Sequence, residues 1–109
     1  MAIYTKKLTG TFSAALQKIH DGILNGSVSA SYEDGSDYEL DGVRCAVRVY
    51  ERYSYMGGNR VSLNVTLFGR DGELFLTAIT SGGSQALFFK LNTMGEEAFL
   101  ERLTELVES

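Results

Sequence analysis

The feature that most constrains the fold is a regular alternation of apolar and polar residues on both sides of one tight turn. Residues 60–69 and 73–81 each alternate with period two, which is typical of β-strands that bury one face. Asp71-Gly72 between them is a strong signal for a two-residue hairpin turn. This turn pairs Arg70 with Glu73 and sets apolar residues opposite each other on the core face: Leu67 with Leu76, and Val65 with Ala78.

Two glycine pairs mark further turns. Gly82-Gly83 as a two-residue turn sets Ala78 opposite Leu87 and Leu76 opposite Phe89, on a strand over 85–91. A two-residue turn at Gly57-Gly58 would set the apolar Val49 opposite the polar Thr66. We therefore predict an odd-length loop there, which pairs Val49 with Val65 or Leu67.

Helical patterns flank this region. Phe12, Leu16, Ile19 and Ile23 form one stripe, with Thr11 as the N-cap and Asn25-Gly26 as the stop. Near the C-terminus, Thr93 and Glu96 have the spacing of a capping box ahead of a second apolar stripe. Residues 34–42 are predicted as a turn-rich segment, and the remaining strands are predicted over 3–9, 27–33 and 43–55.

These elements predict an α+β fold. We expect a two-layer sandwich in which an N-terminal and a C-terminal helix cover one face of an antiparallel meander sheet, in the order β-α-β-β-β-β-β-α. The predicted core face of the sheet is apolar throughout: Val43, Cys45, Val47, Val49, Val61, Leu63, Val65, Leu67, Leu74, Leu76, Ala78, Leu87, Phe89 and Leu91.

Size and composition limit the class of protein. The chain has 109 residues, 44% of them hydrophobic, so we expect one globular domain over residues 1–109. It shows no signal-peptide pattern, no apolar run long enough to cross a membrane, and one cysteine, which together predict a cytoplasmic protein with no membrane partner. The net charge of −4 argues against nucleic acid as a partner.

The second face of the predicted sheet is unusual for a face in water. Its aromatic and aliphatic residues are bordered by arginines and few acids, which is the composition of a protein interface. We expect a homodimer through this face; the alternative is scattered surface aromatics covered by arginine stems. The predicted interface residues are Arg48, Tyr50, Phe68, Phe75, Ile79 and Phe88.

The glycine loops around Gly57-Gly58 and Gly82-Gly83 fall at the same end of the predicted meander, with Val61 opposite Gly82. Together they offer backbone N–H groups, hydroxyls, amides and arginines, which suit a small anionic or polar ligand. The alternative is that the glycines serve the turns alone. The predicted ligand-binding residues are Arg52, Asn59, Arg60, Ser81, Gly82, Gly83, Ser84 and Gln85.

No arrangement of residues in the sequence predicts catalysis. His20 lies beside the helical stripe without a nucleophile or paired carboxylate, Cys45 is predicted to be a buried thiol, and the acidic segment 33–41 lacks calcium-loop spacing. We therefore expect no catalytic residue, no metal site, no cofactor and no enzyme activity. An apolar cavity between the sheet and the C-terminal helix stays open as an alternative, because core packing and a pocket use the same residue types.

Two segments carry a resemblance to a known family. Residues 51–69, with the sequence Glu51-Arg52-Tyr53-Ser54-Tyr55-Met56-Gly57-Gly58-Asn59-Arg60 and the strand that follows, and residues 78–86 resemble an uncharacterised bacterial family, filed as a domain of unknown function. Its members are small cytoplasmic proteins of about this length. The resemblance implies a bacterial, cytoplasmic, single-domain protein, and it implies no activity, cofactor or catalytic residue.

Overall fold

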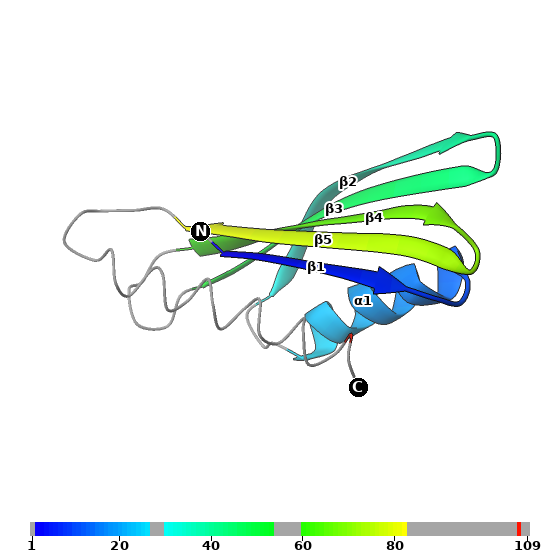
Figure 1. Ribbon diagram of the computed structural model, residues 1–109. Helices are drawn as coiled ribbons and strands as arrows, with labels where there is room; N and C mark the ends of the chain where they lie inside the picture. The colour runs from blue at the N-terminus through cyan, green and yellow to red at the C-terminus, as the bar shows by residue number, and fades with distance from the viewer. Residues whose placement is uncertain (1, 27–29, 54–59, 83–106, 108–109) are drawn as a thin grey trace.

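The structure is a computed structural model, and it describes residues 2–26, 30–53, 60–82 and 107. This part of the chain forms five strands and one helix (Figure 1). In chain order these elements are β1 (Ala2–Leu8), α1 (Phe12–Gly26), β2 (Ser31–Leu40), β3 (Val43–Tyr53), β4 (Arg60–Arg70) and β5 (Glu73–Gly82). All neighbouring strands are antiparallel, and their order across the sheet is β1-β5-β4-β3-β2.

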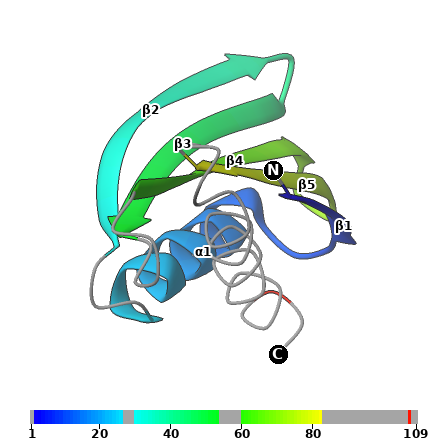
Figure 2. The same cartoon turned by 90° about the vertical axis from the view of Figure 1, so that its left-hand side faces the viewer.

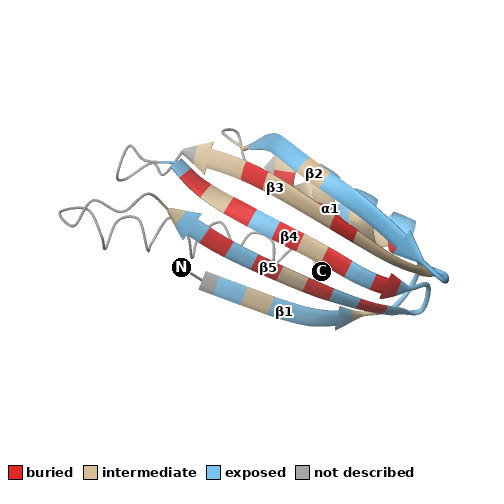
Figure 3. Cartoon of the chain, turned by 90° about the horizontal axis from the view of Figure 1, so that it is seen from above, coloured by how far each residue is buried: buried red, intermediate tan, exposed pale blue. Residues whose placement is uncertain are grey.

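The β4–β5 hairpin confirms the register predicted from Asp71-Gly72. Arg70 pairs with Glu73, Leu67 with Leu76, Val65 with Ala78 and Val61 with Gly82. Gly72 has φ of +91°, which glycine adopts at no steric cost. Burial alternates along both strands, as Figure 3 shows, so each buries one face and leaves the other accessible.

The register of β3 differs from the prediction. Val49 pairs with Asn64, and Tyr50 pairs with Leu63, because an even number of residues separates Tyr53 from its partner Arg60. Ala46 and Tyr50 are therefore the fully buried residues of β3, on the side of α1. The valines and Cys45, predicted for the core, are half-buried on the opposite face. Alternation favoured the valine face because the opposite face of β3 carries arginines beside Ala46 and Tyr50; the even-length connection to β4 nevertheless sets that opposite face toward α1.

The predicted fold class is also wrong. β1 lies beside β5 in the position that was predicted for a strand over residues 85–91. Ala78 pairs with Tyr4, and Leu76 pairs with Lys6. β2 spans residues predicted as a turn. The described residues thus form a five-stranded sheet with one helix, which does not match a β-α-β-β-β-β-β-α order or a covering by two helices.

The C-terminal elements of the prediction fall outside the described residues. These are the strand over 85–91 and the helix after residue 92, with the single exception of Val107. Val107 is helical, half-buried and packed against the core.

The helix α1 lies across the face around which the sheet curls (Figure 2). Phe12, Ile19 and Ile23 are buried there against β3, β4 and β5, as the apolar stripe predicts. The predicted N-cap is confirmed, since the N–H of Ala14 donates to Oγ1 of Thr11 at 3.2 Å. The helix ends at Gly26, also as predicted.

Candidate functional site

The sheet face turned away from α1, called the outer face below, is the most distinctive surface of the described chain. Six of the seven exposed large hydrophobic side chains among the described residues lie on it: Ile3, Tyr38, Leu40, Phe68, Phe75 and Ile79. The half-buried residues of β3 between them are Val43, Cys45, Val47 and Val49. Scattered apolar residues are normal on a surface, but several exposed ones gathered on one sheet face are typical of an interaction site.

One row of side chains crosses the outer face from edge to edge. Successive registers place Lys7, Phe75, Phe68, Cys45 and Tyr38 side by side. The ring centroids of Phe68 and Phe75 are 6.5 Å apart, and the ammonium group of Lys7 lies 5.6 Å from the Phe75 ring centroid. The centre of the row is therefore apolar, and its charge lies at the β1 edge.

At one end of the outer face the β2–β3 hairpin rises from the rest of the sheet (Figure 1). A depression of about 640 Å³ lies there, with apolar walls formed by side chains of three strands. These are Tyr38, Leu40, Val43, Cys45 and Phe68, and the charged residues Glu39, Asp41 and Arg44 complete the lining. A side chain from another molecule can enter such a depression without displacing any part of this chain.

The structure divides the predicted interface residues between the two faces. Phe68, Phe75 and Ile79 are exposed on the outer face, as predicted. Tyr50 is fully buried on the α1 side, and Arg48 lies on that side too, so neither belongs to the outer face. Both errors follow from the register of β3. Phe88 lies outside the described residues.

The arginines of β3 bind parts of this chain. Arg44 stacks over the Phe12 ring at 4.3 Å and donates to Ser13 Oγ at 3.0 Å. Arg48 donates to both carboxylate oxygens of Asp37, at 3.0 and 3.2 Å. These arginines and the acidic residues of β2 thus lie side by side in the β2–β3 pair, although residues 34–42 were predicted as a turn-rich segment.

A cluster of rings connects α1 to β2 and β3. Nδ1 of His20 lies 2.9 Å from the Tyr50 hydroxyl, and the rings of His20, Tyr32 and Tyr50 are mutually in contact, with centroids 5.4 to 5.8 Å apart. Burial raises the pKa of Tyr50 to about 12, so its hydroxyl keeps its proton at neutral pH. Since a buried hydroxyl needs an acceptor, we assign Tyr50 as the donor to Nδ1, which leaves the ring proton of a neutral His20 on Nε2.

This cluster borders a shallow depression of about 280 Å³ lined by Leu16, Gln17, His20, Tyr32 and Arg48. Gln17 already donates to Asp21 at 2.8 Å, and Arg48 is held by Asp37. His20 itself is half-exposed, and its Nδ1 is engaged by the Tyr50 hydroxyl.

The glycine-rich end of the sheet is described in part. Residues 54–59 and 83–85 lie outside the described residues, and with them Asn59, Gly83, Ser84 and Gln85. The pairing of Val61 with Gly82 places the ends of β3, β4 and β5 at the same end of the sheet, as predicted. Arg60 donates to Glu51 at 2.8 Å, and the Ser62 and Ser81 hydroxyls are 3.0 Å apart. Arg52 is half-buried on the α1 side.

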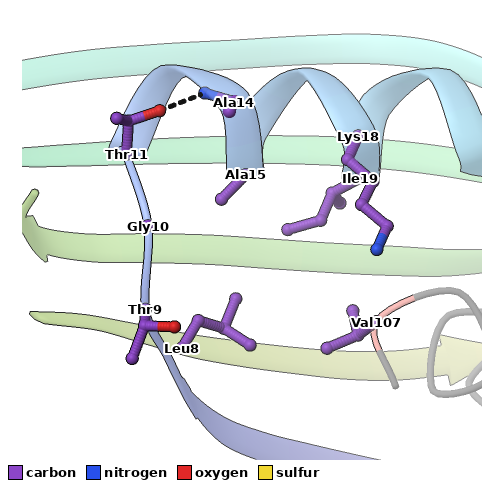
Figure 4. A pocket seen from close by; sticks show the side chains of 9 residues that line it. All are labelled: Leu8, Thr9, Gly10, Thr11, Ala14, Ala15, Lys18, Ile19 and Val107. Atoms are coloured by element: carbon purple, nitrogen blue, oxygen red, sulfur yellow. Dashed lines mark hydrogen bonds between the residues drawn. The ribbon is translucent and has the colours of Figure 1, made fainter. Parts of the chain in front are cut away.

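A third depression, of about 330 Å³, lies where β1 passes into α1 (Figure 4). Its walls come from Leu8, from Ala14, Ala15 and Ile19 of α1, and from Val107. Lys18 extends along its rim. Among the described residues, no group of three or more His, Cys, Asp or Glu side chains is placed to hold a metal ion, and no helix is long and apolar enough to cross a membrane.

One comparison with known proteins identifies a relationship. A family of unknown function, DUF6054, matches the chain over residues 1–109. No curated protein and no solved structure matches it. The relationship agrees with the resemblance to a domain of unknown function, and it assigns no activity to any residue.

Proposed function

We propose that this chain, which belongs to the DUF6054 family, is a non-catalytic assembly module that forms a homodimer through its outer face. The observation that carries the proposal is the concentration of exposed apolar side chains on that face. Leaving them in water costs free energy, which burial against a second copy recovers. The bacterial and cytoplasmic setting implied by the family resemblance belongs to the same proposal.

The dimensions of the outer face fit a stable pair. Its five strands have 7 to 11 residues each. At about 4.8 Å between strands and about 3.3 Å per residue, such a face covers roughly 750 Å². A specific interface of standard size buries about 800 Å² on each partner. The face is therefore large enough to hold a dimer together if most of it is covered.

The distribution of residues supports the same proposal. The middle rows of the outer face hold Thr66, Thr77, Val47, Phe68 and Phe75, with no charged residue among them. Charged residues lie at the margins, as Lys7 in β1 and Asp34 in β2. An apolar centre with a polar rim is the usual arrangement of a protein interface.

A small anionic or polar ligand at the glycine-rich end is the weaker candidate function. The guanidinium group of Arg60 is engaged with Glu51, and Ser81 is engaged with Ser62. A ligand would have to compete with these contacts. Assembly through the outer face requires no such rearrangement.

The experiment is sedimentation equilibrium from low to several hundred micromolar protein. We expect the wild-type chain to form a dimer, and Phe75→Lys and Ile79→Lys to be monomers with unchanged circular dichroism. Both side chains are exposed in the single chain, so a charge there is compatible with folding. Asn25→Lys, at the exposed end of α1, is the matched control and should dimerise like the wild type. A wild-type monomer throughout this range, or undiminished dimerisation of both outer-face variants, would refute the proposal.

A further inference from the structure

The depression where β1 passes into α1 opens onto the apolar core. Leu8, Ala15 and Val107 line it and are half-buried against the core, and Ile19, which also lines it, is fully buried. Figure 4 shows that these side chains come from β1, from α1 and from Val107 and surround the same space. Water in such a space lies against apolar surface, so an apolar ligand that displaces it gains free energy.

Two small side chains on one side of α1 leave this space open. Lys18 follows Ala14 by four residues and Ala15 by three, so the three side chains are neighbours on that side of the helix. All three line the depression, and each alanine contributes only a methyl group to its wall. A longer side chain at either alanine position would occupy the space.

The charge at this depression is positive. Lys18 is the one charged residue among the described residues that line it, and no described carboxylate forms an ion pair with its ammonium group. Asp21, one turn further along α1, accepts a hydrogen bond from Gln17. The depression on the outer face is different, because two acidic residues and one arginine line it. Charge complementarity therefore favours an anionic group beside Lys18.

The volume of the depression limits the size of its ligand. Its volume of about 330 Å³ is roughly twice the about 150 Å³ of a cavity that holds benzene, so it suits an apolar group of about ten carbon atoms. Thr11 and Lys18, which both line it, are seven residues apart, or about 10 Å along a helix axis. The space is therefore long enough for a short hydrocarbon chain that ends at the ammonium group.

We propose that this depression binds a small amphiphile, a carboxylate with an unbranched hydrocarbon chain of about eight to ten carbon atoms. The chain of the ligand packs against Leu8, Ile19 and Val107, and its carboxylate pairs with the ammonium group of Lys18. This inference goes beyond assembly through the outer face, because α1 lies on the opposite face of the sheet (Figure 2). Ligand binding and dimerisation therefore involve different surfaces and can be tested separately.

Octanoate and its uncharged analogue 1-octanol are the probes for this site. Each is titrated into the full-length chain labelled with nitrogen-15, and the amide resonances are followed by NMR. We expect saturable binding of one octanoate per chain, with the largest shifts between Leu8 and Ile19, which include most of the lining residues. The absence of saturable shifts at millimolar octanoate, or largest shifts outside this segment and away from Val107, would overturn the proposal.

Variants that fill the depression test its position. Ala15→Leu places a branched side chain in the space, and we expect it to lower the affinity for octanoate at least about tenfold. Ala14→Leu is a second filling variant at an exposed position, which folding tolerates more easily. Circular dichroism identifies the variants that fold. Undiminished octanoate binding by the folded filling variants would contradict the site.

A change of charge at Lys18 tests the position of the carboxylate. Lys18→Met keeps a long side chain without its charge, so we expect a loss of about threefold in affinity for octanoate at low salt and none for 1-octanol. Lys7→Met, on the outer face, is the matched control and should bind both probes like the wild type. Phe75→Lys should also bind octanoate normally, which separates this site from the dimer interface. Unchanged octanoate affinity in Lys18→Met, or an equal loss for both probes, would overturn the pairing of the carboxylate with Lys18.

Discussion

The main-chain N–H of Phe12 donates to Oδ1 of Asp71 at 2.9 Å, across 59 residues of sequence. Asp71 belongs to the β4–β5 turn, and Phe12 is the first residue of α1. The next residue of the turn, Gly72, donates its N–H to the Gly10 carbonyl at 2.7 Å. The hairpin turn thus caps the helix and fixes where α1 starts on the sheet, in addition to the local cap from Thr11.

Replacing Asp71 by alanine is expected to lower the free energy of unfolding by about 1–2 kcal/mol, because a helix N–H loses its acceptor and the helix dipole loses a favourable charge. Asp71→Asn keeps an oxygen acceptor and a good turn residue, so its loss should be smaller. Urea denaturation measures both. Equal stability of the wild type and Asp71→Ala would show that the turn does not support the helix.

Gly69→Ala should be more harmful than a glycine replacement in an open turn. Gly69 has φ of +137°, and a Cβ there would collide with the Glu73 carbonyl oxygen. Gly10 has φ of +91° with open space around it, so Gly10→Ala reports the backbone strain alone. We expect the free energy of unfolding to fall by about 1 kcal/mol in Gly10→Ala and by more than about 2 kcal/mol in Gly69→Ala. Thermal unfolding measures both variants, and equal losses of stability would contradict the expected collision at Gly69.

Tyr50 predicts a loss of stability at alkaline pH. Burial raises its pKa from 10.0 to about 12, so the folded state holds the phenol proton more tightly than the unfolded state does. The stability that the protonated Tyr50 phenol gives the folded state is fully present below pH 10 and is lost as the pH rises from 10 to 12. Two pKa units correspond to at most about 2.7 kcal/mol. Tyr50→Phe should remove this segment of the pH–stability curve, and an identical slope in both proteins would contradict the assignment.

The direction of the His20–Tyr50 hydrogen bond can be observed directly. With the Tyr50 hydroxyl as donor, neutral His20 is the Nε2–H tautomer. Nitrogen-15 NMR of the neutral imidazole ring should show a protonated Nε2 and an unprotonated Nδ1. Tyr50→Phe should shift the Nδ1 resonance because the donor is gone. A protonated Nδ1 in the wild type would show that His20 donates to the Tyr50 hydroxyl and would contradict the assignment.

Arg48→Lys is expected to cost about 1–2 kcal/mol, because lysine cannot reproduce the paired contact with both oxygens of Asp37. The side chain of Arg48 is only 15% exposed, so water does not easily replace that contact. Arg70→Lys, at an exposed position at the end of β4, is the control and should change stability by less than about 0.5 kcal/mol. A loss of stability in Arg48→Lys no larger than that in Arg70→Lys would show that the ion pair with Asp37 contributes little to stability.

The part of the fold that could be read from sequence is local. Asp71-Gly72 and two alternating segments determine the β4–β5 pair, because a tight turn fixes the register of its own strands. Thr11 and the apolar stripe likewise determine α1. In both cases the signal lies within about twenty residues of the structure it specifies.

What failed depends on contacts between distant residues. β5 could pair with β1 or with another strand, and the apolar alternation of β5 is compatible with both partners. For β3, alternation favours the valine face over the face of Ala46 and Tyr50, which also carries arginines, and the buried face is decided instead by α1 and by the length of the connection to β4. For β2, the acidic residues resemble a solvated turn until the arginines of β3 are placed beside them.

The same errors moved the candidate surface. Phe68, Phe75 and Ile79 were assigned to the correct face because their hairpin was correct. Tyr50 and Arg48 were assigned to it, and Val43, Cys45, Val47 and Val49 were excluded, because one register was wrong by one residue. The corrected surface contains more aliphatic residues and fewer arginines than the predicted one.

The irregularity in β2 has a consequence for the way the sheet ends. The register shifts between Tyr32 and Asp34, so that Tyr32 and Gly35 share the side of α1 although they are three residues apart. A foreign strand approaching this open edge finds hydrogen-bonding groups out of step at the shift and a series of carboxylates beside them. Such an edge is a poor template for continued β-pairing. The sheet therefore resists templated, fibril-like growth at its acidic end even though its broad face is apolar.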